Sequence, residues 1–490
     1  MNRRNFSRNV LMAGIAIPSL NLKTSPDSPQ PEFQNYERKN LPEREFDVVV
    51  AGAGTAGVVA AIAAARQGAK TALIELKGYP GGTVVEGGTA LHSFFNLWKA
   101  FPGVEKRQVV VGIPQEIIDR LLLIGGTSGH NEMTTNYDYD SVCTSIDTEL
   151  YKLTAFEMLA EAGVFICVNT MVAGAVRKGS SVEGVITESR MGRELFKAKC
   201  FVDCTAYGDL SAKAGASFTE LNDYSVCNSM GIANVNIEKL YEYLKSINTL
   251  GQLTFGRRDG KDNQVVRFGA EGAALTGSGL PSEYVAEMRK LGAGLITTTV
   301  HDNYLMFIKI NYQLPGSPLN RDEVAKAELI IRQNQLKTLN LFKKYLPGCE
   351  NAFIARTSPS LNIRRGRTII CDYDIASEDI LQGKHFDDDI MVYGFHDEAP
   401  RLQVKNGGTY GVPYKALRVK DIDNLLAAGM MITSDHHAHM STRNTVCCMG
   451  QGQAAGTAAA LCALRKTGTR KLPYADLKNA LKKDNVYLES

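Results

Sequence analysis

The glycine pattern Gly52-Ala53-Gly54-Thr55-Ala56-Gly57 constrains the fold more than any other feature of this chain. It follows the apolar run 46–50, which is typical of a buried parallel strand, and it opens an alanine-rich segment, 55–67, which predicts a helix. Residues 71–74 predict the next strand. A strand, a glycine turn, a helix and a second strand in this order indicate an α/β domain of the Rossmann type.

The residues of this turn have separate physical roles in binding a dinucleotide. Gly52 permits the tight turn, Gly54 lets the backbone approach a pyrophosphate, and Gly57 lets the helix pack on the strand. The residues after Gly54 begin the helix, whose free N–H groups and positive dipole end favour phosphate. Glu75 comes about 20 residues later, where a carboxylate accepts hydrogen bonds from ribose.

A second glycine-rich stretch distinguishes FAD from NAD as the cofactor. Gly81-Gly82-Thr83 follows the second predicted strand, and Gly87-Gly88-Thr89 comes next. Here the chain resembles the large family of FAD-dependent oxidoreductases related to fumarate reductase and succinate dehydrogenase flavoproteins. In that family a Gly-Gly-Thr loop runs beside the flavin, so the resemblance implies FAD. A dehydrogenase that uses only nicotinamide would not account for this loop.

The resemblance extends over nearly all of the chain after residue 45. Residues 111–117 and the Gly125-Gly126 pair are similar to the family's next segment. The run 147–163 is similar to its following helix, and Val172 falls where the family contacts adenine.

The run 201–209 resembles a family turn usually written Asp-Ala-Thr-Gly-Asp-Gly-Asp. The resemblance implies that Thr205, Gly208 and Asp209 contact the cofactor. Ala206 and Tyr207 depart from the family pattern, because they replace a glycine and an acid. The close approach of the backbone at this turn is therefore less firmly implied than at Gly54.

The last motif lies near the carboxyl end of the chain. Residues 424–429 predict a short strand, and 450–458 open an apolar helix. In the relatives such a helix points its amino end at the flavin pyrimidine, where it stabilises the negative charge of a reduced flavin. This resemblance assigns five further residues to the cofactor: Gly450, Gln451, Gly452, Gln453 and Ala454.

Candidate catalytic residues lie in two segments. His436, His439 and Arg443 match polar positions that precede the last helix in the family, and a histidine there could remove a hydroxyl proton. Arg364, in the run Arg364-Arg365-Gly366-Arg367, could hold an anionic or hydroxyl-rich substrate. For the histidine segment the alternatives are metal binding and hydrogen bonding within a loop. For the arginine segment the alternative is an exposed basic strand edge.

Length and patterning suggest the domain organisation, since 490 residues exceed what a single core fills. We expect an α/β FAD-binding domain in two parts with an inserted α+β substrate or cap domain, which contains a helix over 321–346. The expected limits are an export signal at 1–20, a linker at 21–45, the FAD-binding parts at 46–216 and 408–475, the cap at 217–407 and a tail at 476–490.

The amino terminus resembles a twin-arginine export signal. Arg3-Arg4-Asn5-Phe6 precedes an apolar run, 10–20, and a polar proline-rich stretch. We expect a periplasmic or otherwise exported protein, with membrane contact only through an uncleaved signal. A disordered basic tail is the alternative.

Composition limits the other partners. The formal charge of +3 gives no reason to expect nucleic acid, and the ten cysteines show no zinc or iron–sulfur spacing, so we expect no metal site. His92 does not match the family's covalent-flavin motif, so non-covalent FAD is expected.

The sequence therefore predicts an FAD-dependent oxidoreductase that transfers a hydride between a small hydroxyl-bearing or unsaturated substrate and FAD. A separate electron donor or acceptor is expected. The alternatives are an ene reductase like fumarate reductase, and a flavin-binding electron carrier without substrate turnover.

Overall fold

A computed structural model describes residues 41–88, 90–96, 107–134, 142–270, 279–396 and 404–489. The expected export signal and Thr89 lie outside the described residues. No helix among the residues described here is both long and apolar enough to cross a membrane.

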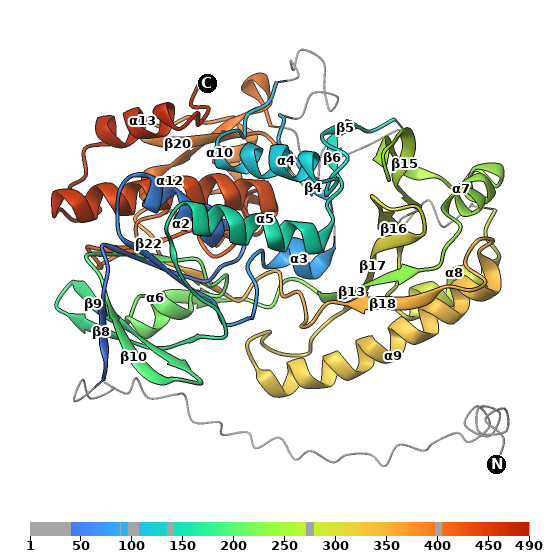
Figure 1. The fold of residues 1–490 in the computed structure, drawn as a ribbon, viewed down its shortest axis with the longest axis horizontal. Coiled ribbons are helices and arrows are strands. Elements are labelled where there is room, and N and C mark those ends of the chain that lie inside the picture. Colours follow the sequence, from blue (N-terminus) through green and yellow to red (C-terminus); the bar gives the residue numbers. More distant parts are fainter. Residues whose placement is uncertain are drawn as a thin grey trace. The chain divides into compact units, whose positions relative to one another are not determined.

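A five-stranded parallel sheet organises the cofactor half of the molecule, which contains α2 and α12 in Figure 1. Its strand order is β22-β11-β2-β3-β7. Four of these strands are buried along their whole length, which is typical of a parallel sheet covered on both faces. The strands are β2 (Val48–Ala51), β3 (Thr71–Ile74), β7 (Phe165–Cys167), β11 (Cys200–Asp203) and β22 (Leu425–Ala427).

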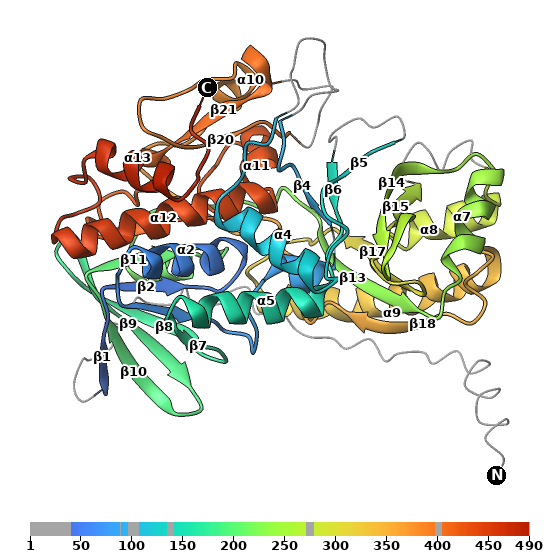
Figure 2. The same cartoon turned by 45° about the horizontal axis from the view of Figure 1, so that its top comes forward.

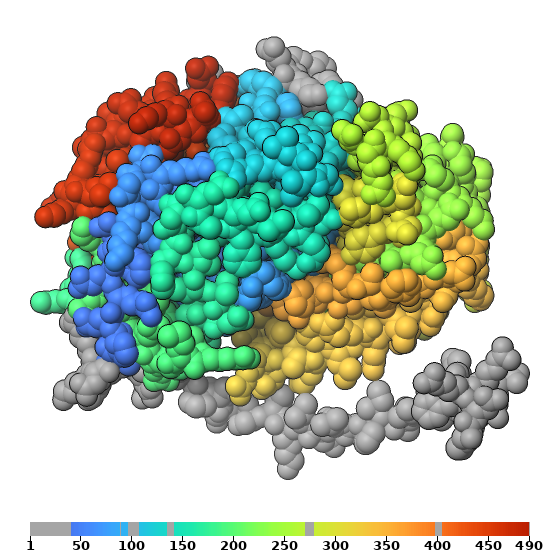
Figure 3. Space-filling model, viewed as in Figure 1, coloured from blue at the N-terminus to red at the C-terminus, as the bar shows by residue number. Residues whose placement is uncertain are grey.

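Two helices from opposite ends of the chain pack together on this sheet. They are α2 (Thr55–Arg66) and α12 (Thr445–Arg465), drawn in blue and red in Figure 2. A Cβ atom at Gly452 would lie 2.2 Å from the Ala56 carbonyl oxygen, and one at Gly456 would lie 2.0 Å from that of Ala60. Glycine is therefore required at both positions because the two backbones touch. Figure 3 shows the early and late parts of the chain meeting on the surface as well.

An antiparallel sheet lies beside the parallel one. It contains β8 (Met171–Lys178), β9 (Ser181–Ser189) and β10 (Gly192–Lys197), and β1 (Glu43–Glu45) pairs with β10 in parallel. The segment expected as a linker therefore contributes a strand, because β1 forms backbone pairs with β10 just before residue 46.

The middle of the chain builds a second hydrophobic cluster, which runs from Val226 to Ile363. The long helix α9 (Arg321–Tyr345) packs against a sheet in the order β17-β13-β18 (Figure 1). The other elements of this region are α7 (Ile237–Ser246), α8 (Ser282–Lys290), β13 (Val226–Ala233), β14 (Gly251–Arg258), β15 (Lys261–Ala270), β16 (Leu295–Thr298), β17 (Tyr304–Tyr312) and β18 (Phe353–Thr357).

The chain returns to the first hydrophobic cluster at Ile369, well before residue 408. The domain limits themselves stay predictions, and this packing favours an earlier end of the inserted part. The expected tail is instead helix α13 (Tyr474–Lys483), whose Leu477 and Leu481 are buried in the first cluster.

The remaining elements are short or connect the two clusters. They are α3 (Thr83–Gly87), α4 (Ile113–Leu123), α5 (Thr148–Glu161), α6 (Asp209–Lys213), α10 (Ser377–Leu381), α11 (His436–Thr442), β4 (Leu91–His92), β5 (Asn131–Glu132), β6 (Val142–Thr144), β12 (Phe218–Glu220), β19 (Arg367–Ile369), β20 (Asp389–Tyr393) and β21 (Tyr410–Pro413), with two 3₁₀ turns, η2 (Asn406–Gly408) and η3 (Tyr414–Ala416). All ten cysteines are free, and all but Cys167 are buried.

Candidate active site

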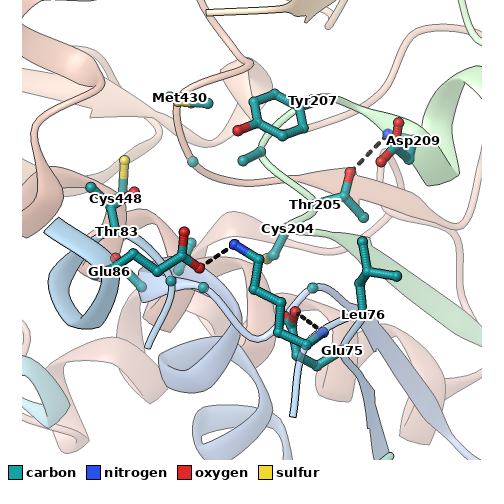
Figure 4. Close-up of a pocket in the computed structure, with 18 of the residues that line it drawn as sticks. Glu75, Leu76, Thr83, Glu86, Cys204, Thr205, Tyr207, Asp209, Met430 and Cys448 are labelled. Carbon is teal, nitrogen blue, oxygen red and sulfur yellow. Dashed lines mark hydrogen bonds and ion pairs between the residues drawn. The ribbon is translucent and has the colours of Figure 1, made fainter. Parts of the chain in front are cut away.

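The site is a cavity of about 310 Å³ at the carboxyl ends of β2, β3 and β11 (Figure 4). Segments far apart in the sequence form its wall. The lining residues are Gly52, Gly54, Thr55, Ala56, Ile74, Glu75, Leu76, Lys77, Tyr79, Gly82, Thr83, Glu86, Thr170, Met171, Val172, Cys204, Thr205, Ala206, Tyr207, Asp209, Asn362, Arg364, Ala428, Gly429, Met430, Arg443, Asn444, Thr445 and Cys448.

The glycine turn leaves the start of α2 open to this cavity. No side chain caps α2, and a Cβ atom at Gly54 would meet nothing within 4 Å. The neighbouring glycines are closely packed instead. A Cβ atom at Gly52 would lie 2.4 Å from the Cys204 carbonyl oxygen, and one at Gly57 would lie 1.7 Å from that of Gly52. Gly57 does not line the cavity, so its role is packing.

Glu75 lies at the end of β3 beside the same turn. Its Oε2 accepts a hydrogen bond from the Ala53 N–H at 2.6 Å, and its Oε1 accepts one from the Lys77 N–H at 2.8 Å. Burial raises the pKa of Glu75 above its usual value, although both hydrogen bonds oppose that shift. The carboxylate is therefore fixed next to the glycine turn.

Beyond Glu75 the cavity has apolar walls. Leu76 is 61% exposed and Met171 is 46% exposed, which is unusual for large apolar side chains in a cavity wall. Val172, the expected adenine contact, is nearly buried and lines the same end. These side chains offer apolar contact to a flat ring.

The Gly-Gly-Thr loop closes the cavity from a third side. The Gly81 N–H donates to the Ala53 carbonyl oxygen at 2.8 Å, and a Cβ atom at Gly82 would lie 2.8 Å from Gly54 Cα. Thr83 begins α3 and lines the cavity, as does Glu86, which forms an ion pair with Lys77 (Figure 4). Sequence reasoning missed this pair, since nothing in the local pattern joins the two residues.

The turn after β11 is held by the buried carboxylate of Asp203. Its Oδ1 accepts from the Thr205 N–H at 3.0 Å and from the Thr205 hydroxyl at 2.7 Å. The Asp209 N–H then donates to the Thr205 hydroxyl oxygen at 2.7 Å. Ala206 has a φ of 68°, so this non-glycine residue adopts the left-handed conformation that the family turn reserves for glycine. Gly208 faces Ile369 rather than the cavity.

The last helix presents different residues to the cavity from those expected. Helix α12 begins at Thr445, and the side chain of Asn444 caps it by accepting from the Val446 N–H at 3.1 Å. The expected start at Gly450 is therefore wrong. The five residues from Gly450 to Ala454 are buried inside the helix and do not line the cavity.

The two glutamines of that segment have structural partners. Gln451 Oε1 accepts from the Gly429 N–H at 2.8 Å, and Gln453 Oε1 accepts from the Ile113 N–H at 3.0 Å. Gln451 thereby fixes the 428–430 segment, which does line the cavity. Its influence on the site is indirect.

Of the predicted catalytic residues, Arg364 and Arg443 line the cavity and the two histidines do not. His439 is fully buried. Its Nε2 lies 2.8 Å from the Met430 carbonyl oxygen and its Nδ1 lies 3.1 Å from the Tyr224 hydroxyl. Burial, aided by Arg365 and Arg443, lowers the pKa of His439 well below its usual value. A carbonyl only accepts, so Nε2 carries the proton and Nδ1 accepts from Tyr224.

His436 is held by a second pair of residues that sequence reasoning missed. Its Nδ1 lies 2.7 Å from Asp223 Oδ2, and its ring stacks on Tyr224 with centroids 4.8 Å apart. The guanidinium of Arg443 lies 5.2 Å from the Tyr224 ring centroid. Neither histidine lines the cavity. Both contact Tyr224 instead, and these contacts fix the position of its side chain. Asp223 and Tyr224 lie more than two hundred residues earlier in the chain, so no local pattern indicated them.

Among known protein families, residues 47–481 match the family model described as FAD dependent oxidoreductase. The chain belongs to this family. No curated protein matches this FAD-dependent oxidoreductase.

Similar solved structures include a geranylgeranyl bacteriochlorophyll reductase-like protein from Thermoplasma acidophilum, with 12% identity and a TM-score of 0.47 over 91% of this chain and 85% of that one. The p-nitrophenol 4-monooxygenase from Pseudomonas putida DLL-E4 has 10% identity and a TM-score of 0.44 over 92% and 91%.

The cofactor of this oxidoreductase is FAD, and the described residues fit it. The uncapped start of α2 and the open space at Gly54 suit a pyrophosphate, and Glu75 is placed for ribose hydroxyls. Leu76 and Met171 supply apolar contact at the adenine end. The start of α12, capped by Asn444, lies at the opposite end of the lining, where its dipole favours negative charge.

No group of His, Cys, Asp and Glu in the described ranges is arranged to hold a metal ion. The polar side chains of the cavity lining include Tyr207, Asn362, Arg364 and Arg443.

Proposed function

We propose that this oxidoreductase transfers a hydride between a small organic substrate, either hydroxyl-bearing or unsaturated, and FAD bound without a covalent link. One observation carries the proposal: a single cavity is lined both by the nucleotide-binding elements and by the polar side chains of Asn362, Arg364 and Arg443. A protein that only stored electrons would not need those polar side chains.

When it is bound, FAD supplies the hydride acceptor or donor. The chain's own residues orient the substrate and stabilise the charge that develops. The start of α12 favours negative charge at its end of the cavity. Arg443, held against Tyr224, adds a fixed positive charge there. His439 helps to orient the Tyr224 hydroxyl, because its Nδ1 accepts a hydrogen bond from that hydroxyl at 3.1 Å; the His436 carbonyl oxygen lies 3.4 Å from the same group.

A non-covalent cofactor is supported by the position of His92. This residue is buried on β4 and does not line the cavity. Precipitating the purified protein with acid tests the point. We expect FAD in the supernatant, whereas a yellow pellet would contradict a non-covalent link.

An ene reductase related to fumarate reductase is the second candidate, and the pair of arginines in one cavity favours it. Anaerobic bleaching separates the candidates. Loss of flavin absorbance on adding alcohols or hydroxy acids supports oxidation of a hydroxyl. Oxidation of pre-reduced flavin by unsaturated acids supports the ene reductase. If no member of either group changes the flavin spectrum, the proposal of substrate turnover fails.

We further propose that the protein is exported and exchanges electrons with a separate carrier. The support for export is the twin-arginine pattern at Arg3 and Arg4. Replacing both with lysine should keep FAD-loaded protein in the cytoplasm, as fractionation would measure. Unchanged export of that variant would contradict the proposal.

A further inference from the structure

The three arginines of the 364–367 segment differ in their partners. Arg365 pairs with Asp223 at 2.5 Å, and Arg367 pairs with Asp209 at 2.9 Å. Arg364 donates from Nη1 to the Ser225 carbonyl oxygen at 2.8 Å, and its Nη2 lies 3.8 Å from Cys227 Sγ. Within the part of the chain that the structure describes, Arg364 forms no ion pair.

Arg364 is partly buried and lines the cavity. A partly buried charge without a counter-charge is costly, because the protein does not replace the water it has lost. An anion in the cavity would restore that interaction. The uncapped start of α2, where the FAD pyrophosphate fits, has its own N–H donors, so Arg364 is available to a second anion.

Tyr207 provides a neutral donor in the same cavity. Ala206, whose backbone is left-handed, precedes Tyr207. The Tyr207 carbonyl oxygen accepts a hydrogen bond from Arg367 Nη1 at 3.1 Å. Its ring packs on Gly366, where a Cβ atom would lie 3.2 Å from Cδ1. Figure 4 shows the hydroxyl end of the ring directed toward Met430.

Burial raises the pKa of Tyr207 well above its usual value, so the hydroxyl stays protonated and can donate. Its backbone is strained at Ala206 and fixed by Arg367, which makes the donor rigid. Strain of this kind concentrates at sites where a side chain must be aimed.

We propose that Arg364 and Tyr207 together bind a carboxylate of the substrate, which makes the substrate a small carboxylic acid. This inference deepens the proposed function and rests on it. Arg364 supplies the positive charge and Tyr207 a hydrogen bond, a pairing that suits the two oxygens of a carboxylate. The substrate has to fit in the part of the cavity that FAD leaves, because both are bound in the same cavity.

The test uses the full-length, FAD-loaded protein and follows flavin absorbance during titration. The probes are glycolate, malonate and succinate, each compared with its uncharged amide, and inorganic phosphate. We expect the carboxylates to perturb the flavin and the amides to bind far more weakly. Equal binding of acids and amides, tighter binding of phosphate, or no response to any carboxylate would overturn the proposal.

Variants assign the effect to the two side chains. Arg364→Gln should weaken carboxylate binding about 10- to 100-fold, the range for a hydrogen bond to a charged group. Arg364→Lys should lose less because it keeps the charge. Tyr207→Phe should lose about three- to tenfold, the range for a neutral hydrogen bond. Arg321→Gln is the control, since that side chain is 95% exposed at the start of α9.

FAD content and melting temperature of each variant separate binding from folding. If Arg364→Gln fails to hold FAD, Arg364→Lys and Tyr207→Phe decide the outcome, and wild-type carboxylate affinity in both would overturn the proposal. Carboxylate binding through Arg364 without any flavin reduction would leave this site intact and refute the proposed hydride transfer. Bleaching of the flavin by neutral substrates alone would support the proposed hydride transfer and refute the carboxylate site.

Discussion

At the scale of single residues, the glycines of the cofactor site serve two purposes that the sequence motif does not separate. Gly57 is glycine because a Cβ atom would lie 1.7 Å from a carbonyl oxygen. Gly54 has open space around its missing side chain and an extended backbone. Gly57 is therefore required for packing of the fold, whereas Gly54 leaves space for the ligand.

Gly54→Ala should therefore weaken FAD binding while the apoprotein stays folded. The methyl group enters the space that suits the pyrophosphate, and we expect about a tenfold or larger loss of affinity. The unfolding free energy of the apoprotein should fall by only about 1 kcal/mol, because alanine is a poorer helix cap than glycine but adopts the same extended backbone. Titration of apoprotein with FAD and urea unfolding measure the two quantities.

Gly57→Ala is the matched variant, and it should lose the fold rather than only the cofactor. Unchanged FAD affinity in Gly54→Ala would show that the pyrophosphate does not use this turn.

At the scale of elements, the contact between α2 and α12 holds the site together. Gly452 and Gly456 let the helices touch at the Ala56 and Ala60 carbonyl oxygens. Since α2 begins at the phosphate end and α12 begins beside Arg443, the spacing of these two helices sets the spacing of the two ends of the cavity.

Gly456→Ala should destabilise the protein by about 3 kcal/mol, because overpacking in a rigid contact costs roughly this much. Gly294→Ala is the control, since nothing lies within 4 Å of its Cβ position. Thermal unfolding of both apoproteins gives the comparison, and equal melting temperatures would contradict the close contact.

Elements whose signals are local were predicted well from the sequence. The expected helix 55–67 is α2, the strand 71–74 is β3, and the helix 321–346 is α9, because period and composition set them directly. The start of α12 was misplaced because the glycines there signal helix packing, whereas Asn444 sets the cap. The contacts of His436 and His439 could not be predicted because their partners, Asp223 and Tyr224, come from a distant segment.

At the scale of the whole molecule, an ion-pair cluster ties the cofactor half to the middle region. His301 lies between β16 and β17. Its Nε2 is 2.5 Å from Asp147, the cap of α5, and its Nδ1 is 3.1 Å from Asp259. The hydrogen bond to Asp147 raises the pKa of His301 to about 9, against the effect of burial.

This shift predicts how stability changes with pH. A raised histidine pKa means that the folded state holds the proton more tightly, so the stabilisation is complete below about pH 6.5 and is lost as pH rises through about 9. Because the side chain is 35% exposed, we expect only about 1–2 kcal/mol. His301→Asn should remove the decline over this window in urea unfolding, and a persisting decline would refute the assignment.

FAD should stabilise the whole molecule, because its cavity is lined by core residues of the first hydrophobic cluster and by Tyr207, which packs against the second. At 100 to 1,000 times its dissociation constant, FAD should add about 3–4 kcal/mol to the unfolding free energy. Riboflavin, which lacks the pyrophosphate, is the control and should add much less. Equal shifts in melting temperature would contradict the role of the α2 start.

The order of the strands in the parallel sheet has a consequence for synthesis of the chain. Gly54 leaves the ribosome early, yet its cavity is closed by residues up to Cys448. At about 5–20 residues per second, the 394 residues from 54 to 448 take roughly 20–80 s to make. The edge of β11 that β22 will cover stays open for part of that time, from the synthesis of Asp203 to that of Leu425, and a ribosome-bound chain should capture FAD only after α12 emerges.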